Sequence, residues 1–298
     1  MTGPNEMLFG LQEKSSVPDP RPSSTPTAPL SADTGKIAVA FRRCAEEGRA
    51  ALVPYICAGY RSREETLELL VAAADAGADV LELGVPFSDP LADGPTIQRA
   101  SYEALRAGMT VRGVLDLLRA FREERETPVV IFTYLNPILR FGADEFLQAA
   151  REAGAQGLLV TDLPAGADPE LEGKIRSEAL DPILLVAPTT APGRVEEVSR
   201  GGRGFLYYIS RTGVTGSRSA LRESLAKEVE EVRRRSTLPV AVGFGISSPE
   251  QAELVAQWAD GVVVGSALVE ELDRGGVADA AKFLGALRGA MDRRHAPG

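Results

Sequence analysis

The chain reads Leu81-Glu-Leu-Gly-Val-Pro-Phe-Ser-Asp-Pro-Leu-Ala-Asp-Gly-Pro-Thr-Ile-Gln98, a short apolar segment followed by a loop rich in glycine and proline. Residues 80–83 are typical of a covered strand, and the residues after them are typical of turns. Glu82 stands within the strand, and Asp93 follows in the loop. An ionised side chain in a covered strand is costly unless it is paired or takes part in chemistry. Glu82 is therefore a candidate for proton transfer.

The same change from a short β-branched run to a longer helical pattern recurs on both sides of this stretch. Eight strands are predicted, at residues 51–56, 80–83, 129–132, 157–160, 183–186, 204–208, 240–242 and 261–264. Amphipathic helices are predicted between them, at residues 62–76, 111–126, 144–153, 192–200, 220–235 and 249–258. A further helix is predicted before the first strand, at residues 37–47.

Repeated β-α units predict a parallel sheet, and eight of them predict a (β/α)8 TIM barrel with an extra N-terminal helix. An open doubly wound sheet is the alternative architecture. Such a sheet would be expected to carry a glycine fingerprint after its first strand. The residues found there, Cys57-Ala-Gly-Tyr-Arg-Ser62, do not match that fingerprint. The barrel is therefore favoured.

Composition limits the possible partners and the domain organisation. The 298 residues are 44% hydrophobic and 25% charged, and no apolar run is long enough to cross a membrane. The formal net charge of -9 disfavours nucleic acid and anionic membranes as partners. Residues 1–34 are rich in proline, serine and threonine and are predicted to form a disordered extension. Residues 35–298 are then a single catalytic barrel domain.

Cysteine and histidine usage narrows the chemistry. Cys44 and Cys57 make neither a disulfide framework nor a metal site, which fits a reducing cytoplasm. The only histidine, His295, lies close to the C-terminus, so histidine-based triads and histidine-rich zinc sites are not expected. No metal is predicted, and proton transfer falls to carboxylates, tyrosine or lysine.

In a barrel of this kind, active residues lie at the carboxyl ends of strands and in the loops that follow them. Glu82 falls at the end of the second strand and Asp93 in the next loop, so both carboxyl groups can face one cavity. The alternative makes Glu82 a buried structural acid and Asp93 a turn residue before glycine.

Two glycine-containing turns follow the last two predicted strands. Gly243-Phe244-Gly245 follows the seventh strand, and Gly265-Ser266 follows the eighth. Glycines at these positions let backbone amides and a helix N-terminus approach an anion, which predicts a phosphate site that includes Phe244, Gly245, Gly265 and Ser266. Each turn taken alone could instead be an ordinary connection between a strand and a helix.

The segment Tyr207-Tyr-Ile-Ser-Arg-Thr-Gly-Val-Thr-Gly216 predicts a strand that ends in a mobile loop closing over a phosphorylated substrate. Thr215 could hydrogen-bond a catalytic carboxylate, and Gly216 could add an amide to the phosphate site. An exposed surface loop without function is the alternative.

Five motifs in order resemble the tryptophan synthase α chain. They are the segment 81–98, Tyr134-Leu-Asn-Pro137, Asp162-Leu-Pro164, Ser210-Arg-Thr-Gly-Val-Thr-Gly216 and Gly243-Phe-Gly-Ile-Ser247. The resemblance implies cleavage of indole-3-glycerol phosphate to indole and glyceraldehyde 3-phosphate, a retro-aldol step of tryptophan biosynthesis that needs no cofactor. One departure is Gly59-Tyr60-Arg61, because the family commonly has proline at the third of these positions.

The resemblance also implies roles for individual residues. Glu82 would protonate the indole ring carbon and later take the glycerol hydroxyl proton, while Asp93 would stabilise positive charge at the indole nitrogen. Thr215 would orient Asp93, and Tyr207 would help to shape the site. Tyr55 and Phe132 end strands facing the same mouth and could flank the indole, although packing in the barrel core is equally compatible with both.

A partner is implied as well. Asp89, Pro90, Asn136 and Pro164 match positions that face a pyridoxal-phosphate β chain in the family, so an assembly of two α with two β chains is expected. Two alternatives stay open. One is a stand-alone lyase that releases free indole, and the other is a non-catalytic subunit that only activates its partner.

Overall fold

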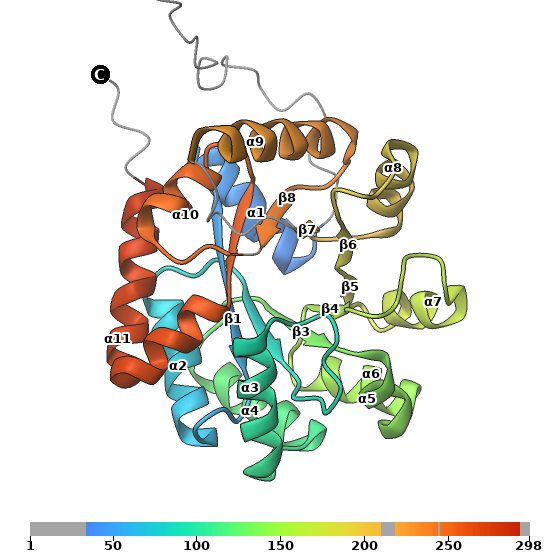
Figure 1. The fold of residues 1–298 in the computed structure, drawn as a ribbon. Coiled ribbons are helices and arrows are strands. Elements are labelled where there is room, and N and C mark those ends of the chain that lie inside the picture. The colour runs from blue at the N-terminus through green and yellow to red at the C-terminus, as the bar shows by residue number, and fades with distance from the viewer. Residues whose placement is uncertain (1–33, 210–217, 244, 293–298) are drawn as a thin grey trace, which may run out of the picture.

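The computed structural model describes residues 34–209, 218–243 and 245–292, which form helices arranged around a parallel sheet (Figure 1). The strands are β1 (Ala51–Cys57), β2 (Leu81–Gly84), β3 (Val129–Thr133), β4 (Gly157–Val160), β5 (Asp181–Pro182), β6 (Leu184–Val186), β7 (Leu206–Ile209), β8 (Val240–Gly243) and β9 (Gly261–Val264). The sheet order is β5-β4-β3-β2-β1-β9-β8-β7-β6. The predicted extension at residues 1–34 lies almost wholly outside the described residues, so the structure does not test it.

The sheet closes into a barrel through the segment that contains β5 and β6. β5 pairs with β4, and β6 pairs with β7. Only Ile183 separates the two short strands, and its amide donates to the Leu158 carbonyl at 3.0 Å. Together they occupy one position of eight, as the (β/α)8 prediction requires. The prediction of the fold is confirmed, although the fifth strand is interrupted and begins earlier than the expected residue 183.

Helices surround the strands, and one of them covers the amino end of the barrel. They are α1 (Lys36–Glu46), α2 (Arg63–Asp75), α3 (Pro95–Arg106), α4 (Val111–Glu124), α5 (Leu135–Phe141), α6 (Ala143–Glu152), α7 (Pro169–Ser177), α8 (Pro192–Gly201), α9 (Arg218–Arg235), α10 (Pro249–Val255) and α11 (Ser266–Asp292). Four of them, α3, α5, α7 and α11, are not among the helices named from the sequence. On α1, Ile37 and Phe41 are buried in the inner core, where Phe41 stacks on Phe205 with ring centres 5.1 Å apart.

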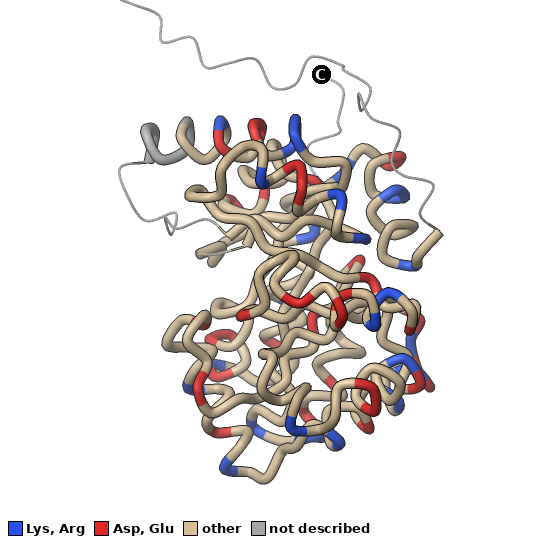
Figure 2. Tube along the Cα trace, turned by 90° about the vertical axis from the view of Figure 1, so that its right-hand side faces the viewer, with Lys and Arg blue, Asp and Glu red and all other residues tan. Residues whose placement is uncertain are grey.

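The inner and outer cores follow from the alternation of side chains along each strand. Val53, Val130, Leu159 and Val263 belong to the cluster inside the barrel, whereas a larger cluster lies between strands and helices. Figure 2 shows acidic and basic residues mixed over the outside of the molecule. Within the described part of the chain, no helix is long and apolar enough to cross a membrane.

A buried ionic cluster fastens the amino end of the barrel around Asp79, directly before β2. Its carboxylate is 2% exposed and accepts two hydrogen bonds from Arg49 at 2.8 Å, and others from Arg43 at 3.1 Å and Arg288 at 3.3 Å. The Leu52 amide donates to it at 3.0 Å. Burial would raise the pKa of Asp79, but these hydrogen bonds hold it below its usual value. One carboxylate thus ties α1, β1 and α11 together.

Replacing Asp79 with Asn should lower the free energy of unfolding by about 3 kcal/mol, because it removes the buried carboxylate to which Arg43, Arg49 and Arg288 all donate. Urea-induced unfolding of both proteins at pH 7 measures the difference. The control is Asp75→Asn, which breaks the exposed pair between Asp75 and Arg125 and should have little effect. Equal losses in the two variants would contradict the role assigned to this cluster.

Candidate active site

Glu82 is an acid buried inside the barrel. It is fully buried on β2, opposite Tyr55 of β1 and Val130 of β3 in the register of the sheet. Neither of its carboxyl oxygens has a hydrogen-bond partner among the described residues. Burial raises the pKa of Glu82 to about 8. At neutral pH the group therefore carries a proton that it can donate, which is what a general acid requires.

Asp93 lies in the loop between β2 and α3, where it is half-buried. Burial raises the pKa of Asp93 to about 6, and a hydrogen bond from the Tyr134 hydroxyl opposes that rise. The same hydroxyl accepts from the Ala92 amide at 3.1 Å, so Tyr134 holds both the acid and the backbone next to it. At neutral pH Asp93 is mainly an anion. The two acids therefore differ in charge under the same conditions, as a site with one acid and one electrostatic group requires.

Tyr134 was not predicted as a site residue, although it belongs to a quoted motif. It is 3% exposed and stands directly after β3, the strand next to β2 in the sheet. The sequence did contain a signal for this role. Tyr134 directly follows a predicted strand, and the residues that follow the strands of such a barrel face the active site.

Two buried tyrosines face the acids and approach the backbone closely. A Cβ atom on Gly84 would lie 2.2 Å from the Tyr55 hydroxyl, and one on Gly243 would lie 2.3 Å from the Tyr207 hydroxyl. Both glycines are therefore required for the ring positions. Burial raises the pKa values of Tyr55 and Tyr207, and the charges of Glu82 and Asp93 add to both shifts. The two acids thus act on the same pair of rings, which brings all four predicted residues to one end of the barrel.

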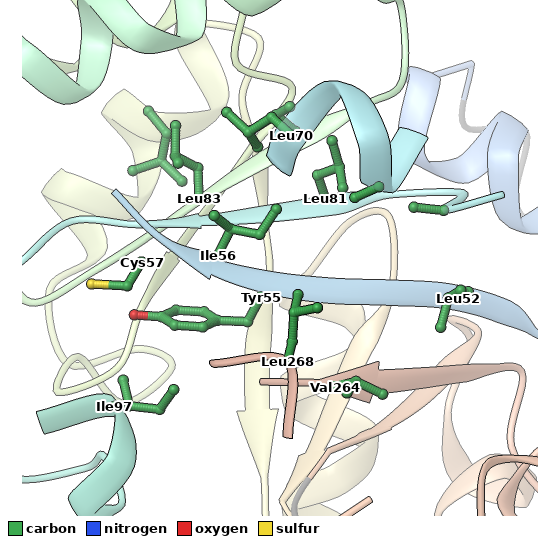
Figure 3. Close-up of a cluster of buried hydrophobic side chains, with 14 of the residues drawn as sticks. Leu52, Tyr55, Ile56, Cys57, Leu70, Leu81, Leu83, Ile97, Val264 and Leu268 are labelled. Carbon is green, nitrogen blue, oxygen red and sulfur yellow. The ribbon is translucent and has the colours of Figure 1, made fainter. Parts of the chain in front are cut away.

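Tyr55 and Phe132 form an aromatic wall on neighbouring sides of Glu82. Their ring centres are 5.1 Å apart and their planes make an angle of 77°, an edge-to-face contact. Figure 3 shows Tyr55 on one side of β1 near Ile97 and Leu268, whereas Ile56 points to the opposite side toward Leu81 and Leu83. Such a wall suits a flat aromatic ring.

The glycines predicted to bind phosphate follow neighbouring strands. Gly245 comes after β8 with φ +74°, and Gly265 comes after β9, immediately before α11 begins at Ser266. Both Gly245 and Ser266 are exposed. A Cβ atom on Gly265 would lie 3.5 Å from the Cβ of Tyr55, so the turn packs directly against the aromatic wall. Phe244, Thr215 and Gly216 lie outside the described residues.

The predicted partner residues lie on the rim formed after β2, β3 and β4. Asp89, Asn136 and Pro164 are exposed, and Pro90 is half-buried. The Leu135 amide donates to Asp162 at 2.7 Å, which ties the loop after β4 to the start of α5. Sequence reasoning did not single out Leu91, which lies on the same rim with 92% of its surface exposed. Among the residues with described positions, no cluster of three His, Cys, Asp or Glu side chains could hold a metal ion.

Comparison with known proteins identifies the family. The family model described as tryptophan synthase alpha chain matches residues 41–289. The chain belongs to the tryptophan synthase alpha chain family. A tryptophan synthase alpha chain of Burkholderia thailandensis is 46% identical over 257 residues, which are 85% of this chain and 95% of the relative.

Solved structures agree with the family assignment. The alpha subunit of tryptophan synthase from Legionella pneumophila is 36% identical with a TM-score of 0.82, and the match covers 88% of this chain and all of that one. A chain of tryptophan synthase from M. tuberculosis is 35% identical with a TM-score of 0.80, covering 87% of this chain and 99% of that one. The family is a lyase that cleaves indole-3-glycerol phosphate in tryptophan biosynthesis, and its members work with a β chain. The predicted family, reaction and partner are confirmed.

The unpaired burial of Glu82 predicts a pH-dependent stability. Its pKa rises from the ordinary value of 4.5 in the unfolded chain to about 8 in the folded one. Below pH 4.5 this group leaves the free energy of unfolding unchanged. As the pH rises from 4.5 through about 8, the free energy of unfolding falls by about 1.4 kcal/mol for each unit of the pKa shift. Glu82→Gln removes the titrating group, so it should be more stable than the wild type at pH 9 and similar to it near pH 4.5. Urea unfolding across this range measures it, and a difference independent of pH would contradict the prediction.

Proposed function

We propose that Glu82 and Asp93 carry out the cleavage of indole-3-glycerol phosphate in this chain. The observation that carries the proposal is the state of Glu82, a fully buried carboxyl group with no hydrogen-bond partner among the described residues and a pKa of about 8. A structural acid would be expected to have partners, as Asp79 does at the other end of β2.

The reaction needs a proton at one carbon and the removal of another from oxygen. Glu82 gives its proton to the ring carbon that bears the glycerol chain, which leaves positive charge at the indole nitrogen. The resulting carboxylate then takes the proton of the adjacent glycerol hydroxyl as that oxygen becomes the aldehyde. The electron pair of the broken carbon–carbon bond returns to the ring, so neutral indole leaves. One carboxyl group serves both steps because donation converts it from an acid into a base.

Asp93 stabilises the charged intermediate as an anion near the ring nitrogen. Its pKa of about 6 keeps it mainly ionised at neutral pH. Tyr134 orients it by a hydrogen bond, in the manner first expected of Thr215. Thr215 stays a predicted second partner of this carboxylate. The indole ring lies between the buried rings of Tyr55 and Tyr207 and the half-buried ring of Phe132, which together exclude water from the reacting carbon.

The phosphate group binds where the chain turns after β8 and β9. Backbone amides of Gly245, Gly265 and Ser266, with Phe244 and Gly216 as further predicted members, surround the anion. The N-terminus of α11 points its free amides and the positive end of its dipole at the same place. The glycerol chain then spans the distance between this turn and Glu82.

The β chain binds the rim that carries Asp89, Pro90, Asn136 and Pro164, in an assembly of two α with two β chains. Asp89 and Pro90 belong to the loop that also carries Asp93, so contact there acts on the acid directly. A stand-alone lyase would need no such rim, and a purely activating subunit would need no unpaired Glu82. Two buried free cysteines and a biosynthetic family support a location in the cytoplasm.

Replacing Glu82 with Gln or Asp93 with Asn should each reduce indole formation by about 10²–10⁴-fold, the usual contribution of a general acid or base. The assay incubates the purified chain with indole-3-glycerol phosphate, with and without a β chain, and measures indole. Glu172→Gln is the matched control, because Glu172 is a 9%-exposed glutamate on α7 that accepts from the Gly166 amide. The proposal fails if Glu82→Gln releases indole at the rate of the control.

The phosphate site is tested separately from the acids. Gly265→Leu should weaken the binding of glyceraldehyde 3-phosphate and of inorganic phosphate together, by about tenfold or more, because a side chain would occupy the space where backbone amides meet the anion. Calorimetric titration measures both ligands. Gly285→Ala, where the added Cβ atom would meet open space near the C-terminal end of α11, is the control and should bind both normally. Normal phosphate binding by Gly265→Leu would place the anion elsewhere.

A further inference from the structure

The turn between β1 and α2 has a left-handed backbone at a residue that is not glycine. Arg61 stands where the family resemblance leads us to expect proline, and its φ is +65°. Proline is fixed near φ -65°, so it is excluded from this conformation. A residue with a Cβ atom adopts positive φ only at a cost, which other contacts must offset. The Arg61 side chain makes two such contacts, to the Leu272 carbonyl at 2.7 Å and to Glu65 at 2.8 Å.

The neighbouring Tyr60 joins two helices through its hydroxyl. The ring is 4% exposed and lines a cavity together with Tyr55, Cys57 and Leu272. Its hydroxyl donates to Asp273 of α11 and accepts from Arg99 of α3 at 2.6 Å. These contacts connect the turn to both helices at once.

Arg99 and Asp273 complete the triangle. The Arg99 guanidinium lies 2.5 Å from the Asp273 carboxylate and 5.5 Å from the centre of the Tyr60 ring. The three side chains Tyr60, Arg99 and Asp273, called the clamp below, therefore contact one another pairwise. Each comes from a different element of the barrel, so the clamp fixes α3 against α11 on the outer side of β1.

Both helices begin at the proposed active site. α3 starts at Pro95, two residues after Asp93, and α11 starts at Ser266, directly after Gly265. The side chain of Ile97 on α3 points toward the phosphate turn, because its Cδ1 would lie 3.8 Å from a Cβ atom on Gly265. Figure 3 shows Ile97 beside the ring of Tyr55. The spacing between the acid loop and the phosphate turn therefore depends on how α3 and α11 are held together.

We propose that Tyr60, Arg99 and Asp273 are positioning residues that fix the distance between Asp93 and the phosphate turn at Gly265. The proposal rests on the proposed function, because it requires the indole and the phosphate of one substrate to bind at these two places. A ligand with two linked ends gains affinity only when both sites are held at the right spacing. The same spacing aligns the reacting carbon with Glu82.

A purely structural clamp would behave differently. Loss of stability alone would lower the fraction of folded protein and affect every ligand equally. If the clamp sets the spacing between the indole site and the phosphate site, its loss should leave the affinity of a ligand that fills one site unchanged. Only the ligand that spans both sites should bind more weakly. Comparison of one-ended and two-ended ligands therefore separates the two roles.

The experiment uses the full chain with Glu82→Gln, which is expected to block turnover, and adds Tyr60→Phe in this background. Calorimetry measures the affinities for indole, glyceraldehyde 3-phosphate and indole-3-glycerol phosphate. Affinity for the two-ended ligand should fall about tenfold while affinities for the other two change by less than about twofold, because only the linked binding depends on spacing. Asp273→Asn, which keeps an acceptor for Tyr60 but removes the charge opposite Arg99, should show the same pattern and replaces Tyr60→Phe if that variant does not fold.

Tyr208→Phe is the matched control. Tyr208 is fully buried, and its hydroxyl donates to Glu228 at 2.6 Å, away from the clamp. All three affinities should stay unchanged in this variant. The clamp is overturned if Tyr60→Phe weakens all three ligands alike or leaves the two-ended ligand unaffected. Indole formation by the Glu82→Gln background would instead overturn the role of Glu82. The role of the clamp would then be tested by comparing the KM values of the same variants for indole-3-glycerol phosphate.

Discussion

The proposed site depends on one constraint, the burial of the Glu82 carboxyl group with no hydrogen-bond partner in the described part of the chain. Glu82 and Asp79 are three residues apart at β2, and both are almost fully buried. Asp79 is surrounded by guanidinium groups, and its pKa is held low, whereas Glu82 faces aromatic rings and its pKa is raised to about 8. An acid that stabilises the fold thus stands just before β2, and an acid that destabilises it above neutral pH stands within that strand. Burial of an acid such as Glu82, which costs stability, is useful where the acid has to transfer a proton.

The surroundings of Glu82 are built to keep water and hydrogen-bond partners away from it. Tyr55 and Tyr207 direct their hydroxyl groups over glycine backbones at Gly84 and Gly243 rather than toward the carboxyl group. Had either glycine been alanine, the ring beside it would have had to move. These glycines therefore determine both the shape of the pocket and the charge state of the acid, because desolvation alone raises its pKa.

Local sequence signals predicted the parts of this molecule that depend on residue type and spacing. Three signals of this kind are an acid in an apolar strand, glycines after the last strands and a repeated β-α pattern. Each can be recognised from neighbouring residues alone. The contact between Tyr134 and Asp93 depends on the register of two strands, which no local pattern records. The expected fifth strand began at Ile183, after Asp181 and Pro182, whereas in the structure these two residues pair with β4 before the chain changes its partner to β7. The positive φ of Arg61 was equally hidden, since the departure from proline was visible but the backbone was not.

The arrangement of loops explains how a partner on the rim could act on the chemistry. The loop after β2 holds Asp89 and Pro90 near its start and Asp93 near its end, and Tyr134 joins that loop to the one after β3. Asp162 joins the loop after β4 to the start of α5. Three neighbouring loops are therefore linked by hydrogen bonds to side chains, which is a route by which a contact on the rim could act on the acid. Coupling of this kind commonly amounts to about 1–3 kcal/mol, which is enough to change activity by one to two orders of magnitude. The opposite side of Asp93 leads into α3, which the clamp holds against α11, so a partner on the rim would act on an acid whose distance from the phosphate turn is already set.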